Sequence, residues 1–399
     1  MRIIVVGGGV VGVTSAYWLK QAGHEVALIE QGHEAGQGVS AGNGGQLSYA
    51  YVEPLAGPEL WAKFPIILLG LDSAVRMRPD LSLDSIRWGL SFVRHCLEPR
   101  HAESLKALLT LAAESRRALS ELQGAVALDF DYAAAGKLIL YRDSRSLARA
   151  GRLAEIKREF GFRLEILDRA ACLSLDPALR DYGNGFAGGV HAPEDAAGDC
   201  AKFTRGLFVH LRDAGAEAHT STRALSLIKR GGRVVGVELD IGERLADAVV
   251  LANGIDAPRL AATIGLRLAI EPVMGYSVTA PARPEAPTIS LTDRGEKIVF
   301  ARLGHRLRAA AFADLDGWSP AIEPKRAARM LTLARHLLPK AAEWSQAEPV
   351  WAGQRPMTPS GLPLIGASAV PGLYLNAGHG GLGWTLACGA AKRLAEVVI

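Results

Sequence analysis

The sequence predicts an α/β fold in which separate stretches of the chain build one parallel sheet and a second, α+β domain is inserted between them. The chain opens with a short apolar strand, a glycine-rich turn and a helix, and it closes with the same three features. Its 399 residues also exceed what one hydrophobic core usually holds. We therefore expect two domains, with glycine-rich ligand-binding turns at both ends of the chain.

The composition is that of a folded soluble protein, with 49% hydrophobic and 22% charged residues. Lys and Arg total 45 against 41 acidic residues, and the net charge of +4 is dispersed, which argues against a nucleic-acid partner. Four cysteines lie far apart without a C-x-x-C pair, so we expect no metal site, no disulfide framework and a reducing cytoplasm. Met1 stands one residue before the first strand, so no signal peptide is expected.

The first thirty residues predict a strand, a helix and a second strand. The strand covers residues 2–6, the helix 13–20 and the second strand 25–29. Between strand and helix, Gly7, Gly9 and Gly12 satisfy the pattern G-x-G-x-x-G. This context argues against a purely structural glycine turn and predicts a dinucleotide-binding unit.

Each residue of this unit has a physical reason. Gly7 permits a sharp turn, Gly9 lets the backbone approach a pyrophosphate, and Gly12 lets the helix pack on the strand. Glu30 follows Gly12 by eighteen residues and is expected to bond both ribose hydroxyls. A free carboxylate there would repel a 2′-phosphate, so NADP is disfavoured.

A loop rich in glycine, hydroxyl and amide side chains covers Ser40 to Ser48. Its main-chain N–H groups are able to close around a flat or anionic ligand, and an ordinary flexible loop has the same composition. From about Pro58 the chain becomes apolar and helical, without glycine fingerprints. Helices are expected at residues 81–96, 102–122 and 146–160, and a strand at 137–141. This block is interpreted as an inserted substrate domain.

The most apolar stretch, Trp61 to Leu71, is shorter than the roughly 18 residues of a spanning helix. Two interpretations stay open for it. It is either a core segment or a loop that dips into a membrane interface.

Near Gly183 the α/β pattern returns. We expect a helix at 200–214, a hairpin from strands 224–230 and 234–240, a buried strand at 248–252, strands at 271–280 and 297–313, and a helix at 324–338. The chain ends with a strand at 373–377, the glycine-rich turn 378–384 and a helix at 385–399. Such a turn before a helix is again suited to an anion or the edge of a ring.

Together these segments resemble the D-amino acid oxidase superfamily of FAD-dependent oxidoreductases, most closely the bacterial D-amino acid dehydrogenases of the small-subunit type. The segments that carry the resemblance are residues 7–30, 40–48, 198–203, 272–277, 302–308, 353–361 and 376–388. The chain departs from the pattern at Ala41-Gly42-Asn43-Gly44-Gly45, where the dehydrogenases tend to have alanine-asparagine-alanine-glycine. Residues 49–54 and 58–72 also differ from the pattern of the family.

The resemblance implies FAD rather than NAD as cofactor. It implies an FAD-binding, Rossmann-like domain of the glutathione-reductase/D-amino acid oxidase type with an interleaved α+β substrate domain. The expected boundaries are 1–57, 183–268 and 350–399 for the FAD-binding domain, and 58–182 and 269–349 for the substrate domain. The expected cofactor-binding residues are Gly7, Gly9, Val10, Val11, Gly12, Glu30, Gln31, Ser40, Asn43, Gly44, Gly45, Gln46, Ala224, Ala252, Gly254, Gly353, Gly378, Gly380, Gly381, Leu382, Gly383 and Trp384.

Three residues are expected to serve catalysis. Arg355, in Gly-Gln-Arg-Pro, matches the arginine that holds the substrate carboxylate in related oxidases, and the planar guanidinium suits that task; the alternative is a surface salt bridge. Tyr276 is expected to bond the same carboxylate, cover the pocket or sit in the core. His379 is expected to stabilise reduced flavin, act as a base or merely position the backbone.

A further set of three arginines is expected on one strand. Arg302, Arg306 and Arg308 alternate along the single strand predicted at 297–313 and would share one face. That face either lines the site or meets solvent.

The resemblance implies oxidative deamination of D-amino acids, with D-proline or hydroxyproline left open, to 2-oxo or imino acids by hydride transfer to flavin. Electrons would pass to a quinone or another carrier. Two alternatives are an oxidase of the glycine or sarcosine type that produces peroxide, and the flavin subunit of a multi-subunit amine dehydrogenase. The expected location is the cytoplasm, with a peripheral contact on the cytoplasmic face of the inner membrane as an option.

Overall fold

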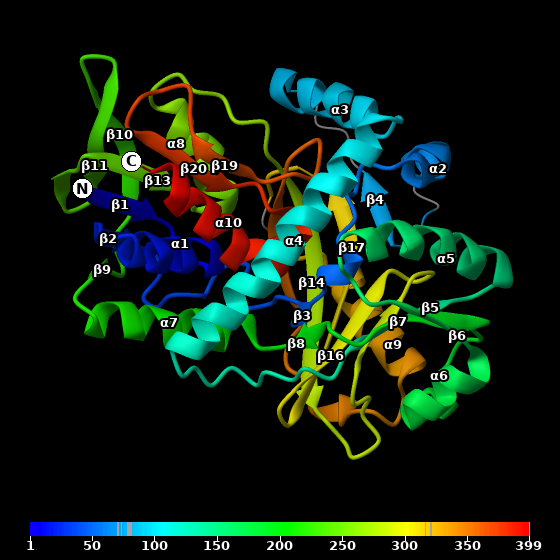
Figure 1. Ribbon diagram of the computed structural model, residues 1–399. Coiled ribbons are helices and arrows are strands. Elements are labelled where there is room, and N and C mark those ends of the chain that lie inside the picture. The colour runs from blue at the N-terminus through cyan, green and yellow to red at the C-terminus, as the bar shows by residue number, and fades with distance from the viewer. Residues whose placement is uncertain (70–71, 73, 78–81, 316, 320, 399) are drawn as a thin grey trace.

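The computed structural model describes residues 1–69, 72, 74–77, 82–315, 317–319 and 321–398, with the side chains of residues 61–63 and 68 left out. Two sheet-based halves lie side by side (Figure 1), and the long helix α4 (Arg100–Ala125) runs across both of them. Both chain termini lie at the far end of one half. The interleaved, two-part α/β arrangement predicted from the sequence is therefore confirmed.

The first half is built on a six-stranded sheet in the order β19-β20-β13-β1-β2-β9. All neighbouring strands in it are parallel except the edge pair β19 and β20. The strands are β1 (Arg2–Val6), β2 (Glu25–Ile29), β9 (Glu217–His219), β13 (Ala248–Leu251), β19 (Leu364–Ala367) and β20 (Leu373–Ala377). Segments from the start, middle and end of the chain thus share one sheet.

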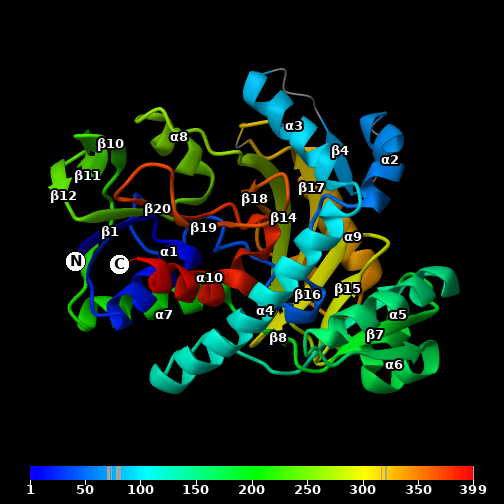
Figure 2. The ribbon, with the colours of Figure 1, turned by 45° about the horizontal axis from the view of Figure 1, so that its top comes forward.

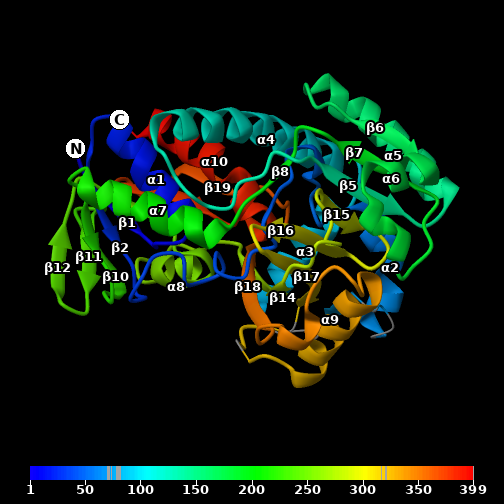
Figure 3. The same cartoon turned by 90° about the horizontal axis from the view of Figure 1, so that it is seen from below.

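Both faces of this sheet are covered, which explains why its central strands are apolar throughout. Ile3 and Val5 of β1 face the helices α1 (Val10–Gln21), α7 (Cys200–Asp213) and α10 (Gly383–Val397). Ile4 and Val6 face the other side, which holds α8 (Ala257–Ala262) and a three-stranded sheet. That sheet consists of β10 (Ala224–Arg230), β11 (Arg233–Leu239) and β12 (Gly242–Leu245). Figure 3 shows these two layers on opposite sides.

The second half is built on a nine-stranded sheet in the order β18-β14-β17-β16-β15-β5-β7-β6, with β4 paired to β17. Its strands are β4 (Val75–Met77), β5 (Lys137–Tyr141), β6 (Glu165–Asp168), β7 (Gly188–Ala192), β14 (Glu271–Pro281), β15 (Ser290–Asp293), β16 (Ile298–Leu303), β17 (Arg306–Leu315) and β18 (Trp351–Met357). The domain boundaries predicted from the sequence placed β7 and β18 with the nucleotide-binding half, and both pair in this sheet. The boundaries themselves stay a prediction.

One face of the nine-stranded sheet packs on α9 (Pro324–Leu337) and α6 (Arg169–Leu175) in an apolar core. The opposite face looks toward the glycine-rich turns of the first half. The remaining helices are α2 (Pro58–Leu68), α3 (Leu83–His95) and α5 (Ser144–Glu159). A short pair, β3 (Gln46–Leu47) and β8 (Ala196–Ala197), connects the two halves.

Helix positions differ slightly from prediction. Helix α1 begins at Val10, three residues earlier than expected, because its first turn is part of the glycine motif itself. Helix α10 begins at Gly383. Positions 81 and 399, the expected ends of two helices, lie outside the described residues.

One predicted element was wrong. The single strand expected at 297–313 is two antiparallel strands, β16 and β17, joined by a tight turn at Gly304 and His305. Gly304 adopts φ +61°, a left-handed conformation that favours glycine. Arg302 therefore lies on a different strand from Arg306 and Arg308, and the predicted common face of all three does not exist.

The apolar stretch Trp61 to Leu71 lies largely in α2. Ile67 is 1% exposed, whereas Ile66 is 47% and Leu69 is 73% exposed, so the stretch is partly buried and partly on the surface. The side chains of Trp61, Lys63 and Leu68 and the whole of Leu71 lie outside the described residues. Among the described residues, no helix has both the length and the hydrophobicity needed to cross a bilayer.

Candidate active site

A cavity of about 1040 Å³ lies between the two sheets, and the glycine-rich turns of both chain ends line it. Of the predicted site residues, only Gly12 and Gly45 are absent from its lining. The lining includes Arg355, Tyr276 and His379 as well as Gly7, Gly9, Val10, Val11, Glu30, Gln31, Ser40, Asn43, Gly44, Gln46, Ala224, Ala252, Gly254, Gly353, Gly378, Gly380, Gly381, Leu382, Gly383 and Trp384. Residues from all five predicted chain segments line this cavity, including Lys137 and Tyr141 from segment 58–182, in which no site residue was predicted.

The first glycine turn fits a pyrophosphate. A Cβ on Gly12 would lie 1.7 Å from the Gly7 carbonyl oxygen, so only glycine allows α1 to start so close to β1. Gly7 adopts φ +111°, which an L side chain rarely accepts. The hydroxyl of Ser40 accepts a hydrogen bond from the Val10 N–H at 3.0 Å and so holds the 40–48 loop against the helix N-terminus.

Glu30 closes the same end of the cavity. Its carboxylate accepts hydrogen bonds from the N–H groups of Gly8 and Gly32, each at 2.6 Å. Two bonds fix the orientation of the carboxylate and leave lone pairs for further donors, such as ribose hydroxyls. A Cβ on Gly8 would come within 2.8 Å of the Glu30 side chain, so the glycine is also needed here. The glycine cradle, the Glu30 carboxylate and the cavity they line therefore fit FAD.

The structure explains why the 40–48 loop has glycine at position 42, where the chain departs from the family pattern. A Cβ on Gly42 would lie 2.0 Å from Cε3 of Trp351, and a Cβ on Gly353 would lie 2.0 Å from Cη2 of the same ring. The indole of Trp351 occupies the space that both glycines leave open. An alanine at position 42 would displace this ring from the cavity wall.

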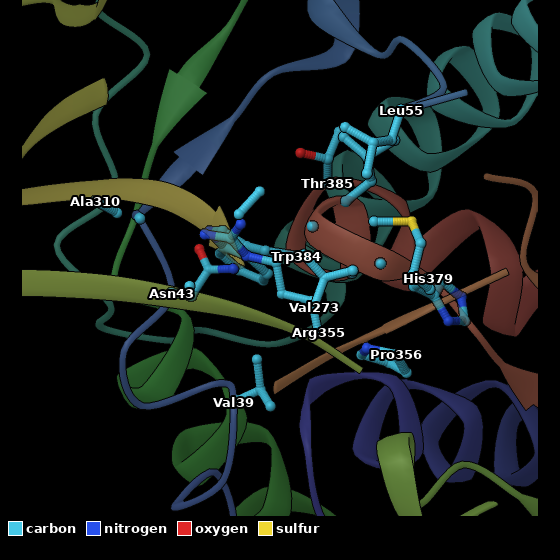
Figure 4. Close-up of a pocket in the computed structure, with 18 of the residues that line it drawn as sticks. Val39, Asn43, Leu55, Val273, Ala310, Arg355, Pro356, His379, Trp384 and Thr385 are labelled. Atoms are coloured by element: carbon cyan, nitrogen blue, oxygen red, sulfur yellow. The ribbon is translucent and has the colours of Figure 1, made fainter. Parts of the chain in front are cut away.

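Arg355 presents its guanidinium to the cavity from β18 (Figure 4). Its Nη1 donates to the Phe312 carbonyl at 2.9 Å. Burial lowers the pKa of Arg355, and the nearby Asp314 carboxylate opposes this shift. Among the described residues no carboxylate lies within salt-bridge distance of the guanidinium, which disagrees with the surface salt bridge considered from the sequence. A half-buried cation of this kind is suited to an anionic ligand.

Tyr276 and His379 are both buried in the cavity wall. Tyr276 is 1% exposed and packs its ring against Phe312, so it belongs to the sheet core as well as to the lining. Burial lowers the pKa of His379 to about 3, so the imidazole is neutral at neutral pH. A neutral imidazole supplies no positive charge to a reduced flavin, and with this pKa it is a weak base at neutral pH.

The three arginines of the β16–β17 hairpin have separate tasks. Arg302 is half-buried, and its Nε donates to the Gly304 carbonyl. Arg306 donates to Asp131 and Asp199. Arg308 is 6% exposed, and its Nη1 donates to the carbonyls of Ala41 and Asn43 at 3.1 and 3.0 Å. Arg308 therefore fixes the 40–48 loop, although it does not line the cavity.

Lys137 is a cavity residue that sequence reasoning missed. Its Nζ donates to Gln46 Oε1 at 2.8 Å and to Ser48 Oγ at 2.7 Å, and it lies over the ring of Tyr51. Burial lowers the pKa of Lys137 to about 7, against the influence of Asp195. The sequence offered one sign of this role, a single lysine at the start of an otherwise apolar strand. Its partners could not be predicted because they lie about ninety residues away in the sequence.

A buried ion cluster lies beside Lys137. Glu53 bonds both Lys157 and Arg294, at 2.9 and 3.0 Å. Burial opposes ionisation of this carboxylate, but the two cations outweigh it and lower the pKa of Glu53 to about 2. Within the described part of the chain, no three His, Cys, Asp or Glu side chains gather as metal ligands do. The four cysteines are buried and free.

Comparisons with known proteins agree with this geometry. The sequence model of a family described as FAD dependent oxidoreductase matches residues 2–397. A "D-amino acid dehydrogenase" of Cereibacter sphaeroides is 39% identical over 400 residues, covering 100% of this chain and 92% of the relative. A "D-amino acid dehydrogenase 2" of Pseudomonas aeruginosa is 40% identical over 402 residues, covering 100% of this chain and 94% of the relative.

Solved structures share the fold. Glycine oxidase from Geobacillus kaustophilus superposes with a TM-score of 0.75 at 23% identity, covering 100% of this chain and 94% of that one. L-proline dehydrogenase from P. horikoshii superposes with a TM-score of 0.76 at 18% identity, covering 100% and 92%.

Proposed function

The chain belongs to the family of FAD dependent oxidoreductases, and from this premise we propose that it oxidises D-amino acids to 2-oxo or imino acids and passes the electrons to a carrier other than oxygen. The family match confirms FAD as the cofactor expected from the sequence. The substrate proposal is supported by the names of the relatives at 39 to 40% identity.

One observation of the structure supports the amino-acid substrate above others. The guanidinium of Arg355 faces the cavity with a single protein hydrogen bond, to the Phe312 carbonyl, and has no carboxylate partner among the described residues. Arginine offers five donors in a planar fork that matches a carboxylate. We assign Arg355 to the substrate carboxylate.

Bound FAD would supply the acceptor for a hydride from the substrate α-carbon. The glycine turn and Glu30 would hold its pyrophosphate and ribose, and the 40–48 loop with residues 378–384 would hold its ring. The protein's other task is orientation. Arg355 fixes the carboxylate, the uncharged His379 forms part of the 378–384 turn, and Tyr276 with Phe312 closes the wall behind them against water.

Rapid mixing tests the assignment. Anaerobic holoenzyme is mixed with matched D- and L-amino acids, including D-proline, and loss of oxidised flavin absorption is followed. We expect reduction by D-amino acids only, with a 2-oxo acid or imino acid as product. Reduction by neither series, with reduction by simple amines instead, would contradict the proposal.

The electron acceptor is decided by a second measurement. Steady-state turnover with a dye or quinone in the absence of oxygen should exceed turnover in air without either. A peroxide yield equal to substrate consumed in air would favour an oxidase. Absence of turnover by the purified chain with every acceptor would favour a subunit that needs partner chains.

A membrane contact would bring the flavin within reach of a lipid-soluble quinone, and we propose an anionic bilayer as the occupant of one apolar surface. Helix α3 exposes Leu83, Ile86 and Leu90 on one side, at 70%, 44% and 60%. Ile66 in helix α2 and Leu69 directly after it are also exposed. Helix α2 lies at the same edge of the molecule as α3 (Figure 2). Arg87 on α3 has a side chain that is 59% exposed, and its ion pair with Asp84 on the same helix is at the surface, so the cation suits anionic headgroups.

Paired substitutions test the membrane contact. Leu83→Glu with Leu90→Glu should release the holoenzyme from anionic liposomes while melting temperature and dye-linked activity stay unchanged. Exposed Leu245→Glu with Ile241→Glu, on the opposite half, serves as the matched control. Ile67 is unsuitable because it is buried, and a charge there would test the core instead. Equal liposome binding by both double variants would refute the contact.

A further inference from the structure

The backbone at Phe312 is irregular where it meets Arg355. Strand β17 pairs with β14 so that Asp314 faces Met274 and Ala311 faces Tyr276. Two residues of β17, Phe312 and Ala313, therefore stand opposite the one residue between, Gly275. This is a β-bulge, and bulges near active sites re-aim a group of the strand.

Phe312 adopts φ +67°, a left-handed conformation in which a bulky residue is strained. Such strain persists only where the surroundings hold the residue. The ring of Phe312 is 3% exposed and packs edge-on against Tyr276, with ring centroids 5.9 Å apart. The guanidinium of Arg326 also lies over the ring, 4.1 Å from its centroid. Both neighbours thus fix the ring.

Arg326 is itself firmly held. Its Nε donates to Asp314 Oδ2 at 2.9 Å, and its Nη2 donates to the other oxygen of the same carboxylate. Arg326 comes from α9 and Asp314 from β17, so the helix anchors the strand immediately after the bulge. The bulge is therefore locked by packing from the core side of the sheet.

The strained backbone turns the Phe312 carbonyl toward the cavity side. That carbonyl accepts the 2.9 Å hydrogen bond from Arg355 Nη1, and within the described part of the chain the guanidinium makes no other hydrogen bond. Gly275 lies beneath the guanidinium, where a Cβ would come within 2.2 Å of Nη2. The bulge thus supplies both an acceptor for the guanidinium and an open place for it.

We propose that Phe312 is a positioning residue for Arg355: its left-handed backbone, locked by its ring, holds the guanidinium at the angle that receives the substrate carboxylate. The proposal rests on the assignment of Arg355 to that carboxylate. In this proposal the effect on Arg355 depends on the backbone conformation of Phe312, whereas in a merely structural role it would depend on the packing of the ring. The two roles call for different substitutions.

Phe312→Asn and Phe312→Val separate the two roles. Both remove the ring and have similar size, but asparagine tolerates the left-handed conformation and a β-branched valine does not. The measured quantity is carboxylate discrimination in the holoenzyme. It is the ratio of dissociation constants for 2-methylalaninamide and 2-methylalanine, which lack an α-hydrogen and are not oxidised, read from the flavin absorption spectrum.

We expect Phe312→Val to lose discrimination by about tenfold or more, the worth of one charge-assisted hydrogen bond, while Phe312→Asn keeps most of it. Arg355→Leu should abolish it. Equal loss in the Asn and Val variants would overturn the inference. Absence of discrimination in the unaltered enzyme would instead refute the assignment of Arg355, so the two failures are distinguishable.

Phe312→Gly and Phe312→Ala form a second pair with lower steric demand. They differ by one methyl group, and glycine adopts the left-handed conformation without cost. We expect the alanine variant to lose more discrimination than the glycine variant. Flavin content and melting temperature are recorded for all four variants, and if the valine protein fails to retain flavin, equal losses in the glycine and alanine proteins would overturn the inference.

Discussion

His379 is neutral because of where it lies. The side chain is 4% exposed, and its Nε2 has no hydrogen-bond partner among the described residues. Burial lowers the pKa of the imidazole from 6.5 to about 3. A ring with so low a pKa stays uncharged and is a weak base near neutral pH, which argues against His379 as the general base. The sequence placed His379 in a ligand-binding turn, but its charge state depends on burial, which single-sequence reasoning does not reveal.

The lowered pKa of His379 predicts a specific acid sensitivity. Between pH 6.5 and about 3 the unfolded chain protonates this histidine and the folded chain does not, so the contribution to stability is complete above pH 6.5 and falls as pH decreases. The slope approaches about 1.4 kcal/mol per pH unit in this window. His379→Asn should flatten the fall in unfolding free energy from pH 6.5 to 4, measured with urea. The exposed His305→Asn serves as control, and equal curves for both variants would contradict the prediction.

Arg355 predicts a kinetic phenotype. Arg355→Leu should raise KM for a D-amino acid by about tenfold to a hundredfold, because a charge-assisted pair is lost, and should lower kcat because orientation is lost. Arg355→Lys should restore activity only in part, since an ammonium lacks the planar fork. Steady-state kinetics with a dye acceptor measure both variants. Unchanged KM in the leucine variant would move the carboxylate site elsewhere.

At the scale of elements, local patterns were predicted well and turns between strands were not. The β1–α1–β2 unit depends on residues close in sequence, and its apolar runs and glycines indicated it directly. The β16–β17 turn was missed because Gly304 and His305 interrupt a run whose apolar and charged residues otherwise continue the alternation. The bulge at Phe312 was missed for a different reason, since it exists only through pairing with β14.

The β17 strand fixes the ligand-binding loop through Arg308. Arg308→Met should weaken FAD binding, because the carbonyls of Ala41 and Asn43 lose their donor, which costs about 1 to 3 kcal/mol for buried groups. Arg302→Met is the matched control, because Arg302 lies on the same hairpin and donates to the Gly304 carbonyl at the turn rather than to the 40–48 loop. The affinity of each variant for FAD is measured from the fluorescence of the flavin that dissociates when the holoenzyme is diluted. A loss of FAD in the control as large as in Arg308→Met would assign the effect to the hairpin as a whole.

At the scale of the molecule, two sheets built from interleaved segments enclose one cavity. The sequence indicated this interleaving because apolar strands and glycine turns recur at both ends of the chain. It did not indicate that β7 and β18 pair in the larger sheet, nor that Lys137 meets Gln46 and Ser48, since these partners lie far apart in sequence. Contacts of this kind follow from topology, which periodicity does not determine.

The shared cavity predicts that FAD stabilises the whole molecule. FAD bound only to the folded chain raises the unfolding free energy by RT ln(1 + [FAD]/Kd), about 2.7 kcal/mol at a hundredfold excess over Kd. The melting temperature of deflavinated protein should therefore rise with the logarithm of added FAD.

Riboflavin gives the discriminating comparison, because it carries the ring but lacks the pyrophosphate and adenosine that the Gly7–Gly12 cradle and Glu30 are assigned to hold. At equal concentration it should raise the melting temperature much less than FAD. Glu30→Gln should reduce the FAD effect and leave the riboflavin effect unchanged, whereas Glu25→Gln, exposed at the start of the same strand, should alter neither. Equal stabilisation by riboflavin and FAD would show that the cradle contributes nothing, and the cofactor would then be held by the 40–48 loop and residues 378–384 alone.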